Sequence, residues 1–238
     1  IYTLAKKWTG ESAEERIGRV RQAMKKKGAD VLVLTALEDP CWLLNVRGND
    51  IACTPVAYAF AMVTMKKVSY YISKEKLNKK VKDYFEKIHV TIRPYEKLAA
   101  DLAKLHGKKI WASLNQLNAD LYSHLAEDNS IINETSPVLL FRAVKNSTEI
   151  RNLKNAHVKD GVAMVQFIRW VKENVSKGGM TELSAQNYLY DRRAEQKDYI
   201  EPSFHTICAY QANAAMMHYS AAEDNYAEIR PRGVLLVD

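Results

Sequence analysis

The chain changes character near residue 145, and this change constrains its fold more than any other feature. Residues 146–149 (NSTE) form a helix-start signal, and the only glycine or proline between them and Gly178 is Gly161. Such a stretch predicts a single helix of about 28 residues, well above the usual length. We therefore predict a domain boundary here, with one domain over residues 1–145 and a second segment over 146–238.

The expected long helix has an apolar stripe. Large apolar residues recur along it at helical spacing, which is typical of a helix that packs one face against a core. We expect the buried face to consist of Ile150, Leu153, Val162, Val165 and Ile168.

The first 145 residues predict an α/β domain. Ser12 followed by Glu15 is a capping-box pattern, and Gly28 ends the apolar helical periodicity that follows. Residues 29–35 (ADVLVLT) then form a short apolar run that is typical of a strand buried on both faces. Short strands and helices continue to alternate, which favours a mixed sheet with flanking helices. The further strands are expected at 58–65, 68–72, 90–93, 109–112 and 130–133, and the helices at 76–87, 96–105 and 117–125.

The second segment offers two candidate site residues. A helix is expected from the N-cap Thr181 to about residue 196, and strands at 204–210 and 234–237. His218 lies at the end of an apolar stretch and Asp238 at the tip of the last strand. Strand ends often carry active-site residues, although a lone histidine is more often structural and an aspartate at a strand end is a common turn starter.

Composition excludes several classes of function. The net charge is +7, but no basic stripe with interleaved aromatic or glycine residues accompanies it, so we expect no nucleic-acid partner. The apolar runs are too short to cross a bilayer and no signal segment opens the chain, which predicts a cytoplasmic protein without membrane contact. Cys41, Cys53 and Cys208 are widely spaced, so we expect reduced and packed thiols.

Three stretches resemble the creatinase, prolidase and X-prolyl aminopeptidase family of pita-bread metallopeptidases. Residues 35–50 (TALEDPCWLLNVRGND) resemble a linker-and-strand segment of the second domain in three-domain X-prolyl aminopeptidases. Residues 146–161 resemble the entry into the long helix of the catalytic domain, and residues 202–238 resemble its start. The resemblance implies a creatinase N-terminal-like α/β domain over 1–145, followed at 146–238 by the truncated beginning of an α+β pita-bread domain.

The resemblance also implies an activity. It is the release of the N-terminal residue from peptides with proline in second position, by a hydroxide that two metal ions, expected to be Mn²⁺, activate. In the family, the histidine of the HY segment lies beside the substrate, and His218 occupies that position. The aspartate of the LVD strand is the first of five metal ligands, and Asp238 occupies it. The other four ligands belong further downstream, so the isolated chain is expected to be inactive.

Several other residues have side chains capable of chemistry. His157 and Asp160 are three apart and share a helix face, where we expect packing and surface roles in preference to an acid–base pair. His205 stands where this branch commonly has an acidic or small residue, and we expect a loop role for it in preference to an extra metal ligand. Gln211 and Ala212 replace a glycine and a proline that are frequent in the family.

Two alternatives stay open at this point. One is a prolidase that acts on Xaa-Pro dipeptides, because the catalytic fold is shared. The other is a non-catalytic binding module of the same fold, since some relatives have lost their metal ligands. The resemblance also admits a homodimer, and an earlier domain is expected to precede Ile1.

Overall fold

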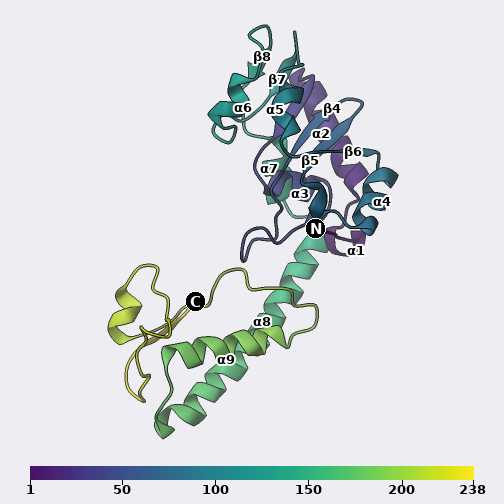
Figure 1. Cartoon of the computed structure of the whole chain (residues 1–238). Coiled ribbons are helices and arrows are strands. Elements are labelled where there is room, and N and C mark those ends of the chain that lie inside the picture. Colours follow the sequence, from purple (N-terminus) through teal and green to yellow (C-terminus); the bar gives the residue numbers. More distant parts are fainter. The chain divides into compact units, whose positions relative to one another are not determined.

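A computed structural model describes all of residues 1–238 (Figure 1). Contacts between residues divide the chain into two units, which comprise residues 1–150 and 151–238. We call them the first unit and the second unit. None of the helices is both long and apolar enough to cross a lipid bilayer.

A mixed six-stranded sheet forms the centre of the first unit, with strand order β6-β5-β4-β2-β7-β8. Pairing is antiparallel between β2 and β4 and between β4 and β5, and parallel at the other three contacts. This confirms the predicted mixed α/β sheet. The strands are β2 (Val31–Leu34), β4 (Ala59–Thr64), β5 (Val68–Ile72), β6 (Val90–Arg93), β7 (Lys109–Trp111) and β8 (Ser130–Ile132).

Helices cover both faces of this sheet, and β2 shows why. All four residues of β2 are buried; Leu32 and Leu34 belong to one apolar core, and Val31 and Val33 to the other. The prediction of a strand buried on both faces is therefore confirmed. The first core includes residues of α2 (Ala13–Lys27), α3 (Glu38–Leu43), α4 (Lys79–Lys87) and α7 (Pro137–Ala143), and the second those of α5 (Lys97–Leu102) and α6 (Ala119–Ser123).

Helix α2 begins and ends where the sequence predicts. The Ser12 side chain accepts a hydrogen bond from the Glu15 amide at 3.2 Å, and the Glu15 carboxylate accepts one from the Ser12 amide at 2.6 Å. Gly28 ends the helix in the left-handed region, with φ of 70°. The capping box and the glycine stop are thus both confirmed.

Short elements complete the first unit. The segment 35–50, which resembles a linker and a strand, contains helix α3 before the two-residue strand β3. Strand β3 pairs antiparallel with β1. The remaining elements are β1 (Tyr2–Thr3), α1 (Lys6–Thr9), β3 (Val46–Arg47) and the 3₁₀ turn η1 (Lys74–Lys76).

A buried arginine connects several segments of the first unit. The Arg16 guanidinium donates to the Trp42 carbonyl and to Asn45 Oδ1, each at 2.6 Å, and lies 4.0 Å above the Trp42 ring. It also donates to the Thr9 carbonyl at 3.2 Å and to Glu149 Oε1 at 3.1 Å. Burial lowers the pKa of this guanidinium, and nearby glutamates counter part of that effect.

The second unit is built on two helices and one two-stranded ribbon. Helix α8 has 28 residues, as predicted, and Thr181 caps α9 through the Ser184 amide. The predicted strand at 204–210 is shorter: β9 comprises only its last three residues, and Ile207 adds one further pair of backbone hydrogen bonds, to Asp238. The elements are α8 (Ser147–Asn174), η2 (Val175–Lys177), α9 (Glu182–Ala194), β9 (Cys208–Tyr210), η3 (Gln211–Ala215) and β10 (Leu235–Val237).

The predicted buried face of α8 is wrong. Ala163 and Phe167 are its buried residues, and they share a core with Ala185 and Leu189 of α9. The buried face of α8 is thus not the apolar stripe of larger residues, because α9 packs on the side of α8 that carries Ala163. The stripe residues stay 44–67% exposed: Ile150, Leu153, Val162, Val165 and Ile168.

The three cysteines are free, as expected. Cys41 and Cys208 are buried, and Cys53 is partly exposed. Burial raises the pKa of Cys208 to about 12, so its thiol stays protonated and unreactive at neutral pH.

We predict that Arg16→Ala lowers the free energy of unfolding of the chain by about 3–5 kcal/mol, because it leaves the Trp42 carbonyl and Asn45 Oδ1 buried without their donor and removes the buried partner of the Glu149 carboxylate. Urea denaturation followed by tryptophan fluorescence measures this loss. The control is Lys6→Ala, which removes an ion pair to Glu15 whose side chains are 60% and 51% exposed. Its effect is expected to stay below about 1 kcal/mol. Equal losses in the two variants would contradict the prediction.

Candidate active site

Asp238 lies at the end of the β9–β10 ribbon. Leu235, Leu236 and Val237 pair antiparallel with residues 208–210. The backbone of Asp238 extends this ladder, since its amide donates to the Ile207 carbonyl at 2.9 Å and its own carbonyl accepts from Ile207 at 2.9 Å. Its carboxylate is exposed and forms no ion pair, so it is available to a ligand.

His218 lies on the segment that leaves the other end of the ribbon. This segment starts after Tyr210 with η3 and ends at the buried Tyr219. The imidazole is exposed, and the neighbouring Met217 is 91% exposed. His218 has φ of 57°, a left-handed conformation that costs a residue with a side chain about 1–2 kcal/mol.

The structure does not bring His218 and Asp238 into contact. No hydrogen bond or ion pair joins the two side chains. The antiparallel pairing places Asp238 beside Ile207, where β9 begins, whereas the His218 segment leaves β9 after Tyr210. Each residue therefore stays a separate candidate, one for metal coordination and one for substrate contact.

A buried carboxylate that the sequence does not predict as a site residue lies against the segment that carries His218. Glu182 is the first residue of α9, and its side chain is fully buried. It accepts hydrogen bonds from the Tyr219 hydroxyl at 2.5 Å, from the Ala227 amide at 2.7 Å and from the Tyr210 amide. The Asn213 side-chain amide contacts both carboxylate oxygens, at 3.0 and 3.1 Å.

These contacts shift two pKa values in opposite directions. Burial by itself raises the pKa of Glu182, but the hydrogen bonds from Tyr219, Tyr210, Ala227 and Asn213 outweigh it and lower the pKa below its ordinary value of 4.5. Burial and the adjacent carboxylate raise the pKa of Tyr219 to about 12. At neutral pH Glu182 is thus a carboxylate held by neutral donors, with no cation beside it.

Nothing local in the sequence marks Glu182 as special. An acidic residue at the first position of a helix is usual, because it complements the helix dipole. The signal that the sequence does contain is the N-cap Thr181, which fixes where α9 starts and hence which residue takes that position. The donors come from residues 28 to 45 positions away, so only the tertiary fold reveals them.

The other candidates have structural surroundings. Asp160 forms an ion pair with Arg193, whose Nε lies 2.7 Å from Oδ1, and His157 is exposed. They are helix-surface residues, as predicted, and not an acid–base pair. His205 is exposed in the loop before β9, which is the loop position expected for it.

The donor set for a metal ion is incomplete within residues 1–238. No group of three or more histidine, cysteine, aspartate or glutamate side chains is arranged to hold a metal ion. Asp238 contributes one exposed carboxylate, a ligand type that suits hard or borderline divalent ions. It fits such an ion as one ligand among several, since affinity requires further ligands and their supporting hydrogen bonds.

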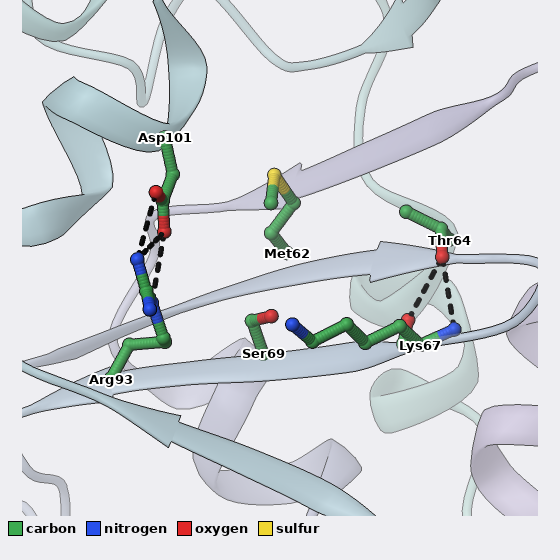
Figure 2. Close-up of a pocket in the computed structure, with 6 residues that line it drawn as sticks. All are labelled: Met62, Thr64, Lys67, Ser69, Arg93 and Asp101. Carbon is green, nitrogen blue, oxygen red and sulfur yellow. Dashed lines mark hydrogen bonds and ion pairs between the residues drawn. The ribbon is translucent and has the colours of Figure 1, made fainter. Parts of the chain in front are cut away.

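The first unit contains an open cavity of about 230 Å³ on the face of the sheet that α5 covers (Figure 2). Its one carboxylate, Asp101, is held by Arg93 through hydrogen bonds of 2.9 and 3.0 Å, and it also accepts from Tyr71 at 3.1 Å. This carboxylate is therefore occupied by protein partners and does not form a metal site. The cavity is lined by Met62, Thr64, Lys67, Ser69, Arg93 and Asp101.

Family models match both units. Residues 1–149 match the model of the creatinase/prolidase N-terminal domain, and residues 151–238 match that of metallopeptidase family M24. The chain therefore belongs to the creatinase/prolidase family, with an N-terminal domain of that type followed by the start of a family M24 metallopeptidase domain.

Curated relatives of the chain are aminopeptidases. It is 36% identical over 244 residues to Xaa-Pro aminopeptidase 1 of Dictyostelium discoideum, an alignment that covers 100% of this chain and 38% of that protein. It is 30% identical over 248 residues to Xaa-Pro aminopeptidase 2 of Mus musculus, with coverage of 100% and 37%. The chain thus spans well under half the length of these relatives.

Solved structures show the same fold. An X-prolyl aminopeptidase from Caenorhabditis elegans, described as a cytosolic enzyme with a di-nuclear active site, superposes with a TM-score of 0.93 at 29% identity and covers 100% of this chain and 40% of that one. A prolidase from Pyrococcus horikoshii OT3 superposes with a TM-score of 0.67 at 16% identity, with coverage of 94% and 60%. The second likeness concerns the fold alone.

We predict that Glu182→Gln flattens the acid side of the pH–stability profile. Because folding lowers the pKa of Glu182, its stabilising effect is complete above about pH 4.5 and is lost as the pH falls through the folded-state pKa. A glutamine does not titrate and removes this contribution. Urea midpoints measured between pH 7 and pH 3 should therefore fall less steeply in the variant. The exposed Glu223, replaced by Gln, is the control and should keep the steeper profile; identical slopes in all three proteins would contradict the prediction.

Proposed function

We propose that the protein to which this chain belongs is an Xaa-Pro aminopeptidase that removes the N-terminal residue from peptides with proline in second position. One observation carries the proposal: the alignment to the Dictyostelium Xaa-Pro aminopeptidase runs through the whole of this chain, at 36% identity. Both units take part in it, so the likeness is not confined to one domain that many functions share.

The substrate class has a physical reason. The amide before proline is tertiary and lacks an N–H group, and the ring fixes the backbone angle φ. A peptidase that recognises its substrate through that N–H cannot use it here. A dedicated site must therefore hold the proline by its ring and by the carbonyl groups on either side of it.

Two divalent metal ions, for which we propose Mn²⁺, would supply a hydroxide nucleophile and polarise the peptide carbonyl. Membership of residues 151–238 in a metallopeptidase family supports this cofactor. Asp238 would be one ligand, through its exposed carboxylate. Further ligands would be needed to complete the site, since residues 1–238 contain no group of three or more histidine, cysteine, aspartate or glutamate side chains arranged to hold a metal ion.

His218 would position the substrate. Its exposed imidazole is capable of a hydrogen bond to a carbonyl of the bound peptide, and the left-handed backbone fixes the direction in which the side chain leaves the segment. We further propose that the protein acts in the cytoplasm; the description of the Caenorhabditis relative as a cytosolic enzyme supports this.

The test uses the full-length protein and three peptides: an Xaa-Pro tripeptide, the matched Xaa-Ala tripeptide and an Xaa-Pro dipeptide. We expect release of the first residue from the Xaa-Pro tripeptide alone, loss of that activity with a chelator and recovery with Mn²⁺. Asp238→Asn should lower the recovered activity by about 100-fold or more, because a metal ligand matters at least as much as its supporting residues. His218→Ala should lower kcat/KM by about 100-fold.

The other outcomes of this assay identify the alternatives. Cleavage of the dipeptide with no cleavage of the tripeptide would replace the proposal by a prolidase. No turnover of any peptide with any divalent metal would favour a binding module that has kept the fold.

A further inference from the structure

The strongest unassigned feature of the molecule is the way in which one buried carboxylate holds the segment around His218. Glu182 accepts from Tyr210 and Asn213, which precede His218, and from Tyr219 and Ala227, which follow it. The donors therefore enclose the histidine on both sides along the chain. The carboxylate is fully buried, so water does not compete for these bonds.

The backbone conformation of the segment depends on the same contacts. Two residues with side chains adopt the left-handed region, Gln211 with φ of 55° and His218 with φ of 57°. Each is directly adjacent to a residue that donates to Glu182, namely Tyr210 and Tyr219. Such conformations persist only where the surrounding structure holds them, and Glu182 is the group that both ends of the segment share.

Between these two ends Ala214 packs against the small apolar core that contains Tyr219, and the two methionines that follow lie at the surface. Met216 is 50% exposed and Met217 is 91% exposed. No ion pair is made by residues 211–219, and the imidazole of His218 lies at the surface. The imidazole forms no hydrogen bond or ion pair of its own, and its neighbour in the chain, Tyr219, is anchored to Glu182.

We propose that Glu182 is a positioning residue that holds His218 in the orientation needed for substrate contact, without touching the substrate itself. This inference rests on the proposed function in one respect only, namely that His218 faces a substrate. Its chemical basis is that each carboxylate oxygen accepts one backbone N–H, from Tyr210 on Oε1 and from Ala227 on Oε2. A backbone N–H can only donate, so no neutral amide side chain satisfies both.

The first experiment is a double-mutant cycle in the full-length protein, with kcat and KM measured on an Xaa-Pro tripeptide. Glu182→Gln places an amide nitrogen against one of the two backbone donors in either orientation of its side chain. We expect it to lower kcat/KM by about 10- to 100-fold, as loss of a supporting residue does. The double variant with His218→Ala should be no slower than His218→Ala alone, because both changes remove the same interaction.

The cycle has two outcomes that would overturn the proposal. Losses that multiply in the double variant would mean that Glu182 acts independently of His218, and a kcat/KM within twofold of the wild type would mean that it has no role. If Glu182→Gln does not fold, Tyr219→Phe takes its place in the cycle. It removes one donor to the carboxylate and keeps the buried ring.

A second measurement needs no turnover and separates this proposal from the proposed function. In the full-length protein, histidine labelled with ¹³C at Cε1 gives one resonance for each histidine, and His218→Ala and His157→Ala assign the two of interest. Glu182→Gln should shift or broaden the His218 resonance and leave that of His157 unchanged, whereas the exposed control Glu223→Gln should change neither. An unchanged His218 resonance overturns the proposal, even in a protein that cleaves Xaa-Pro peptides; a shifted one supports it in a protein that does not.

Discussion

The enclosed charge of Arg16 is the interaction on which the arrangement of the first unit's N-terminal segments depends. A buried guanidinium is tolerated only when most of its donors find acceptors, and here those acceptors come from α1, the end of α3 and the first turn of α8. Gly10 completes the junction, because a Cβ at this position would lie 2.4 Å from Asn146 Oδ1. Glu182 has the corresponding role in the second unit: it is a buried anion whose hydrogen bonds connect segments that are distant in the sequence.

Local signals predicted the elements that are stabilised locally. Helix α2 was predicted to within a residue because its capping box and its terminal glycine lie inside its own sequence. Helix α3 was not predicted, because residues 35–50 were interpreted through their resemblance to a linker and a strand; Pro40 lies in the first turn of α3, where proline is tolerated. Helix α7 begins with Ser136 as its N-cap and Pro137 as its first residue. This pair predicts a helix only together with the short apolar run that follows it.

The sequence predicts individual residues of the site but not how they are arranged. The resemblance singles out His218 and Asp238, and the structure places one on an exposed segment and the other at a strand end. Glu182 was not predicted, since its role arises from donors that the fold brings together from distant positions. The prediction of the buried face of α8 was wrong for a related reason. Periodicity identifies apolar stripes on a helix, but the packing of α9 decides which side is covered.

The pairing of β10 with β9 has a consequence for the direction of Asp238. Side chains alternate along a strand, and Leu235 and Val237 lie against the core of the second unit while Leu236 is 40% exposed. Asp238 extends the ladder by one residue, so its carboxylate emerges on the same side as Leu236. A slip of one residue in this ribbon would turn the carboxylate toward the apolar core of the second unit. The pairing of Val237 with Cys208 therefore fixes the register of the ribbon. This register decides on which side of the ribbon the Asp238 carboxylate would bind a metal ion.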